Sequence, residues 1–185
     1  MSNETVFIAL FRGINVGGHN IIRMAELKTL FGELGFSDAQ TYVQSGNVVF
    51  RAAAGDRKAL AARIGEGVKA RFGLAPHIIV LDANDWAGIV SGNAFPDYNE
   101  PKNVHAYIFD EVPTAERMAE LAGRPKEAGD YAIKGRVLYL HTPDGLLKSN
   151  LPVLIERILR VPMTARNWRT VLALQDMVGK ATVGK

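Results

Sequence analysis

The order of strands and helices constrains this chain more than any other feature of its sequence. Six successive apolar residues, Val6–Phe11, are typical of a strand that is buried on both faces. Apolar spacing and turn residues then predict five further elements: a helix over 24–34, hairpin strands over 40–44 and 47–51, a helix over 56–72 and a strand over 77–81. The first half therefore has the order β-α-β-β-α-β.

The second half repeats this order after a short helix over 84–90. Its predicted elements are a strand over 104–109, a helix over 114–122, strands over 130–134 and 136–141, a helix starting near Ser149 or Asn150, a strand over 161–165 and a final helix over 167–178.

Each half corresponds to a ferredoxin-like, or split β-α-β, unit: a four-stranded antiparallel sheet with two helices on one face. We therefore expect an α+β fold, an α/β sandwich of two such units with an extra C-terminal helix. The expected domains are a first unit over 1–91, a linker over 92–103, a second unit with the last helix over 104–180, and a disordered tail over 181–185.

Composition narrows the class of protein. There is no Cys, which excludes disulfides, thiol catalysis and Cys-type zinc sites, and the His residues have no metal-ligand spacing. With no signal peptide and no apolar run long enough to span a membrane, we expect a soluble cytoplasmic protein with no membrane partner and no cofactor. The net charge is only +3, although the segment from Leu146 onward is distinctly basic.

Chain topology predicts a first ligand-binding cluster. The first two strands of a split β-α-β unit run in the same direction, so the loop after strand one and the hairpin turn after strand two share one end of the sheet. Glycine-rich loops and an arginine at such an end can bind an anion. The candidate ligand-binding residues there are Arg12, Asn15, Gly17, Gly18, Gln44, Ser45 and Asn47.

The same reasoning predicts a second, more basic cluster in the second half, where the third and last strands end together. Its candidates are Lys148, Ser149, Asn150, Arg166, Asn167 and Arg169. A structural alternative stays open here, since Asn167 is also placed to cap the last helix and Trp168 to fill the core.

These clusters leave the function open. The loop after the first strand matches neither the dinucleotide-binding nor the phosphate-loop motif, and no activated nucleophile is visible. The first hypothesis is a site for a small anionic or phosphate-bearing ligand, with or without a catalytic step. The alternatives are a single-stranded nucleic-acid-binding module, using Phe7, Phe11 and Phe50, and a protein–protein interaction domain. The sequence predicts neither the ligand nor the oligomeric state.

Four stretches resemble a known bacterial family, the one catalogued as domain of unknown function 1697. They are Phe11–Gly18, Met24–Leu27, Thr41–Phe50 and Thr164–Val171. The resemblance extends over nearly the whole chain. It implies a two-part α/β protein built from ferredoxin-like units, and it implies no activity and no catalytic residues.

Overall fold

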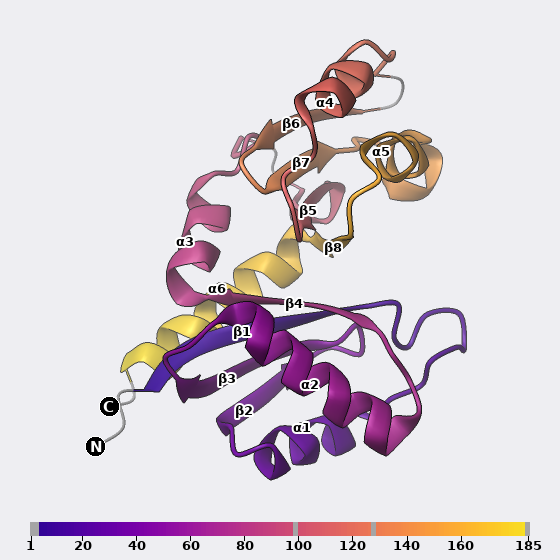
Figure 1. Ribbon diagram of the computed structural model, residues 1–185. Coiled ribbons are helices and arrows are strands. Elements are labelled where there is room, and N and C mark those ends of the chain that lie inside the picture. The colour runs from indigo at the N-terminus through magenta and orange to yellow at the C-terminus, as the bar shows by residue number, and fades with distance from the viewer. Residues whose placement is uncertain (1–3, 98–99, 127–128, 184–185) are drawn as a thin grey trace. The chain divides into compact units, whose positions relative to one another are not determined.

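The computed structural model describes residues 4–97, 100–126 and 129–183 (Figure 1). The first elements are β1 (Glu4–Arg12), α1 (Met24–Glu33), β2 (Ser37–Tyr42), β3 (Asn47–Ala53), α2 (Arg57–Phe72), β4 (His77–Asp82) and α3 (Ala83–Ser91). The remaining elements are η1 (Pro101–Asn103), β5 (Val104–Phe109), α4 (Ala115–Ala122), β6 (Asp130–Lys134), β7 (Val137–His141), η2 (Leu146–Lys148), α5 (Leu151–Leu159), β8 (Met163–Asn167) and α6 (Trp168–Val183).

The strands form two antiparallel four-stranded sheets with the orders β2-β3-β1-β4 and β6-β7-β5-β8. Both orders place the first strand of the unit in the centre, beside the third and fourth strands, as a split β-α-β unit requires. The predicted α+β fold of two ferredoxin-like units is confirmed.

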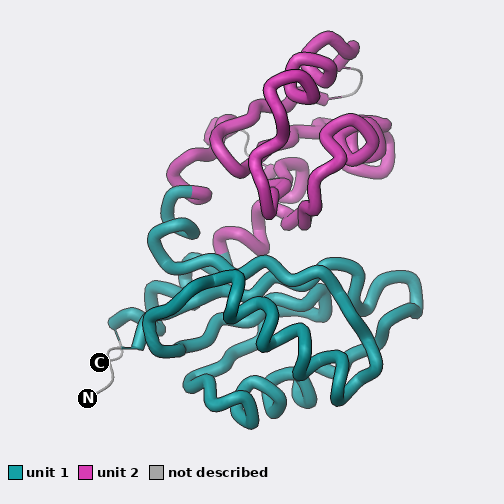
Figure 2. Tube along the Cα trace, viewed as in Figure 1, with its two compact units in different colours: residues 1–88, 173–185 teal, residues 89–172 magenta. Residues whose placement is uncertain are grey.

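The chain divides into two compact units, and the division differs from the expected boundaries (Figure 2). Unit 1 takes the described residues up to Gly88 and again from Ala173, and unit 2 spans Ile89–Leu172. Ala181–Val183 continue α6 where an irregular tail was expected, and the remainder of that tail, 184–185, lies outside the described residues. None of the described helices is both long and apolar enough to pass through a bilayer.

Local sequence signals explain where the helices of unit 1 begin and end. Asp56 precedes α2, and its carboxylate accepts a hydrogen bond from the Lys58 amide at 2.9 Å, a helix N-cap. The end of α1 is closed by the Phe36 amide, which donates to the Phe31 carbonyl at 3.0 Å. The rings of these two Phe residues lie 5.7 Å apart, which is the apolar contact that accompanies such an end.

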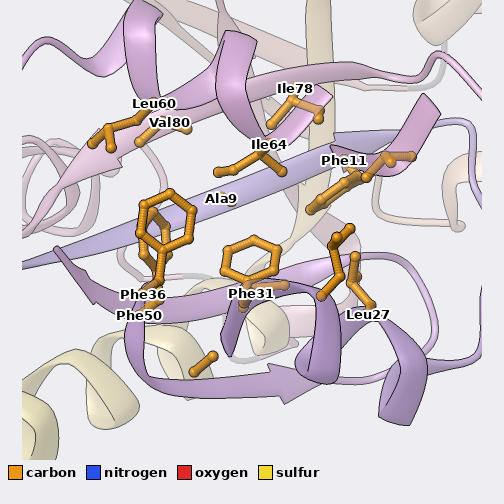
Figure 3. Close-up of a cluster of buried hydrophobic side chains, with 14 of the residues drawn as sticks. Ala9, Phe11, Leu27, Phe31, Phe36, Phe50, Leu60, Ile64, Ile78 and Val80 are labelled. Atoms are coloured by element: carbon orange, nitrogen blue, oxygen red, sulfur yellow. The ribbon is translucent and has the colours of Figure 1, made fainter. Parts of the chain in front are cut away.

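The core of unit 1 lies between one face of its sheet and the helices α1 and α2 (Figure 3). Its centre is a group of phenylalanine rings, in which Phe50 lies 5.1 Å from Phe31 and 4.9 Å from Phe36. On the opposite face of the sheet, Arg51 donates from Nη1 to the Ala181 carbonyl at 2.9 Å, so the end of α6 lies along this face.

The core of unit 2 lies between its sheet and the helices α4 and α5. It includes the side chains of Tyr107 and Tyr131, and the Tyr131 hydroxyl donates to the Leu121 carbonyl at 2.8 Å. Burial raises the pKa of Tyr107 to about 12, with a smaller contribution from the Glu156 carboxylate. This core therefore contains polar groups that depend on internal partners.

Candidate ligand-binding site

The loop between β1 and α1 is fastened to the β2–β3 turn, as the topology predicts. The Phe11 amide donates to the Gly46 carbonyl at 2.9 Å. The Asn15 amide nitrogen Nδ2 donates to the Gln44 carbonyl at 2.8 Å and to the Ile22 carbonyl at 2.9 Å. In Figure 1 this loop leaves the end of β1 as a long excursion from the sheet. Segments about thirty residues apart in sequence thus form one end of unit 1.

Gly46 is what allows this close approach. Its φ is +73°, a left-handed conformation that side chains other than Gly adopt at a cost. A Cβ at this position would lie 2.5 Å from Ile14 Cδ1 and 2.7 Å from Phe11 Cβ. The turn can therefore pack against the loop only with glycine at this position.

Most of the predicted ligand-binding side chains hold the loop and turn in place. Asn47 is fully buried and donates from Nδ2 to the Tyr42 carbonyl at 2.9 Å and to the Ser45 hydroxyl at 3.0 Å. Gly17 and Gly18 are exposed at the end of the loop with positive φ, as expected of loop glycines. The amides of Asn15 and Asn47 thus hold the loop and the turn in place.

A pocket of about 360 Å³ opens beside this loop. The β1–β4 register pairs Arg12 with His77, so the end of β1 meets the start of β4 at the pocket. Both residues line it, together with Gly13, Ile14, Asn20, Leu74, Ala75 and Pro76. Of the predicted residues, only Arg12 contributes to this wall.

The chemistry of the lining suits an anion. Arg12 is exposed, and no Asp or Glu is among the lining residues. Asn20 is held by its own side chain, which donates from Nδ2 to the Gly13 carbonyl at 2.8 Å. Leu74, Ala75 and Pro76 form an apolar side of the pocket. The pocket therefore combines a cationic end with an apolar wall.

His77 is the functional candidate that the sequence interpretation left out. No motif surrounds it in the sequence, and the His residues have no metal-ligand spacing. The signal lies in the topology: β4 runs antiparallel to β1, so its first residue comes beside the last residue of β1. The same argument that joined the loop to the turn also predicts Arg12 next to His77.

The strands that precede the two parts of the second predicted cluster end at one edge of a sheet. Val104 pairs with His141 and His105 pairs with Asn167, so β7 and β8 end at the same edge. Asn167 accepts from the Arg169 amide at 3.0 Å, which caps α6, and Trp168 is buried against the Tyr139 ring. The structural alternative for these two residues is confirmed.

Polar groups of this second cluster are used inside unit 2. The Ser149 hydroxyl accepts from the Leu151 amide at 3.2 Å, at the start of α5. Arg166 is buried and donates to the Thr164 hydroxyl at 2.6 Å and to the Ala165 carbonyl at 2.8 Å. Burial lowers the pKa of its guanidinium to about 10.

Three members of the second cluster, Lys148, Asn150 and Arg169, are exposed. Their role in ligand binding stays a prediction. Within the described residues, no group of three or more His, Asp or Glu is placed to hold a metal ion.

The two sheets with their paired helices define a class, the two-unit α+β proteins built from ferredoxin-like units. The family model described as "Protein of unknown function (DUF1697)" matches residues 5–139, and the chain belongs to this family. A search of the curated proteins finds no significant match.

Among solved structures, the chain is similar to a conserved bacterial protein, SP0830, from Streptococcus pneumoniae. The two share 17% sequence identity with a TM-score of 0.77, over 95% of this chain and 99% of the other. At this identity the likeness shows a shared fold.

Proposed function

We propose that this protein binds a small anionic, phosphate-bearing ligand in the pocket of unit 1. One observation carries the proposal: Arg12 and His77 are paired across β1 and β4 and line the same pocket, whose lining contains no carboxylate. A guanidinium forms paired hydrogen bonds with phosphate oxygens, and an imidazole adds a further donor.

The rest of the lining indicates the shape of the ligand. The phosphate lies at the Arg12 end, and the apolar wall of Leu74 and Pro76 contacts the body of the molecule. A volume of about 360 Å³ is at the small end of ligand pockets, which favours a metabolite over a large cofactor. The cysteine-free composition supports the cytoplasm as the proposed location.

The lining favours binding over covalent chemistry. It holds no Ser, Thr, Lys, Asp or Glu side chain, so no nucleophile of these types faces the ligand. Any reaction in this pocket would depend on the charge of Arg12 and on the imidazole of His77.

The proposal is tested by isothermal titration calorimetry with inorganic phosphate, glycerol phosphate and a nucleoside monophosphate. We expect at least one of these to bind, and Arg12→Ala to weaken that binding by at least about tenfold because the paired hydrogen bonds are lost. Arg23→Ala is the matched control, since it removes an exposed arginine outside the pocket.

Two results would contradict the proposal. Either none of the three phosphates binds the wild-type protein, or Arg12→Ala binds as the wild type does. If Arg12→Ala lowers the melting temperature by more than a few degrees, Arg12→Lys and His77→Gln replace it, and binding that survives in both overturns the site.

The nucleic-acid alternative loses its expected stacking surface. Phe7, Phe11 and Phe50 are buried in the helix-covered core of unit 1, where Phe7 and Phe50 stack on each other at 5.8 Å. Rings in this position cannot stack on the bases of a single strand.

A further inference from the structure

The end of unit 1 that carries the pocket also leaves three aliphatic side chains in solvent. Val16, Ile21 and Val43 are 63%, 60% and 50% exposed. His19 and Arg23 are exposed beside them in the same loop. We name these five residues the apolar tip.

One asparagine joins the backbone segments that bear the three aliphatic residues. The Asn15 backbone amide donates to the Asn20 carbonyl at 3.1 Å, and its side chain donates to the Gln44 carbonyl at 2.8 Å. The three aliphatic residues are the direct chain neighbours of Asn15, Asn20 and Gln44. The residues of the apolar tip are therefore carried by backbone segments that are fastened to one another.

Val43 adds an independent observation, since its backbone is strained. Its φ is +48°, in the left-handed region that Gly, Asn and Asp tolerate and β-branched residues avoid. A valine there is costly in the folded state, and half of its surface remains exposed. Strain that persists at an exposed apolar residue points to a role in contact with a partner.

Charge defines the partner. There is no Asp or Glu from residue 5 to residue 25, or from residue 39 to residue 55, so both segments of the tip are free of acidic groups. Among the described residues, the side chains of His19 and Arg23 form no ion pair. A complementary surface thus carries carboxylates around aliphatic side chains.

We infer that the apolar tip docks an acidic segment of another protein that presents aliphatic side chains. A second copy of this chain fits poorly, because a two-fold contact pairs the tip with itself and places two Arg23 side chains in one interface to which the tip contributes no carboxylate. Nucleic acid also fits poorly, because the tip offers aliphatic side chains where bases require stacking partners.

The test uses a fluorescent peptide that mixes Glu and Leu, read by fluorescence anisotropy. Two control peptides replace every Leu by Ser or every Glu by Lys. We expect the Glu–Leu peptide to bind at least about tenfold more tightly than either control, and added salt to weaken its binding. Equal binding of the three peptides would overturn the inference.

Variants assign the binding to the tip. The double variant Val16→Ser with Ile21→Ser is expected to lose most of the peptide affinity and to keep phosphate binding, since neither residue lines the pocket. Val112→Ser is the matched control, an exposed valine of unit 2. Peptide binding that survives in the double variant would contradict the inference.

Val43→Asn gives a signature that a purely structural residue would not produce. Asparagine relieves the left-handed strain, so the melting temperature is expected to rise by about 2–4 °C while peptide binding falls. If Val43→Asn binds the peptide as the wild type does, Val43 is not part of the docking surface. Binding to oligouridylate or to phosphatidylserine vesicles in place of the peptide, or self-association through the tip, would likewise overturn the inference.

Discussion

The two units share one order of elements, but their helix-covered sheet faces differ in chemistry. In unit 1 this face packs phenylalanine rings with no polar side chain in the cluster. In unit 2 the corresponding face carries Tyr107, Tyr131 and, at its edge, His105. The core of unit 1 is thus built by apolar packing alone, whereas that of unit 2 includes polar side chains: the Tyr131 hydroxyl has an internal partner, and the buried Nδ1 of His105 has none.

The difference extends to the ends where the predicted clusters lie. At the end of unit 1, amides fasten a loop to a turn, and Arg12 is left beside a pocket. The cluster of unit 2 lies at the other end of the shared topology, where the third and fourth strands end, and there Ser149 and Asn167 cap helices and Arg166 is buried in the sheet. The two ends therefore differ in role, because the burial of each side chain decides whether it can contact a ligand.

The largest expected effect tests the all-apolar core of unit 1. Phe31 is fully buried and contacts the rings of Phe36 and Phe50, so Phe31→Ala is expected to cost about 3–5 kcal/mol of unfolding free energy. Urea denaturation measures this loss. Leu147→Ala, at a fully exposed leucine, is the control and should change stability by less than about 0.5 kcal/mol. A loss below about 1 kcal/mol for Phe31→Ala would contradict the packing described here.

Glycines at equivalent hairpin turns sharpen the comparison. Gly46→Ala is expected to cost about 3 kcal/mol, since it adds a clash with Ile14 and Phe11 to the strain of a positive φ. Gly135 also has a positive φ, but no atom lies within 4 Å of a Cβ there, so Gly135→Ala is expected to cost about 1 kcal/mol. Equal losses in urea denaturation would show that the unit 1 turn is no more tightly packed.

The polar edge of unit 2 predicts a dependence on pH. Burial lowers the pKa of His105 to about 4 from an ordinary value of 6.5, so the unfolded chain binds the proton more tightly. The folded state therefore favours the neutral imidazole, and the stability that depends on this form is complete above pH 6.5. It is lost as the pH falls from 6.5 toward 4, by up to about 3 kcal/mol.

The measurement is urea denaturation across this pH range, with His105→Gln as the variant that cannot titrate. The unfolding free energy of the wild type minus that of the variant should fall as the pH falls. A difference that stays constant from pH 7 to pH 4 would mean that His105 does not set this dependence.

The smallest expected effect concerns one hydroxyl. Tyr131→Phe removes the hydrogen bond to the Leu121 carbonyl and is expected to cost about 1 kcal/mol. Thermal denaturation at neutral pH measures it. An unchanged melting temperature would indicate that the hydroxyl does not stabilise this core. The cores of the two units would then both depend on apolar packing.

Local patterns predicted most elements because their signals are contained within a few residues. The helix that ends before Gly73 and the strand Val104–Phe109 are examples, and the latter agrees with the structure at both ends. The expected strand over 161–165 lies two residues further on, at Met163–Asn167, because register with β5 sets its bounds and no local pattern encodes register.

Topology also predicted that the loop after β1 meets the turn at Gly46, which the structure shows. It did not predict which polar atoms face solvent. Asn15 and Asn47 have short amide side chains close to backbone carbonyls, and they donate hydrogen bonds to those carbonyls. Arg166 alternates to one side of its strand and is buried there, which the spacing of basic residues does not reveal.

The hydrogen bond from Arg51 to the Ala181 carbonyl has a consequence for biosynthesis. A ribosome releases the strands of unit 1 early, while the helical segment that accepts from Arg51 emerges 130 residues later. One face of the unit 1 sheet therefore lacks this helical segment until the whole of unit 2 has been translated. A nascent chain cut at the α3 boundary would expose this face to chaperones, and a gene split there would not encode two self-sufficient halves.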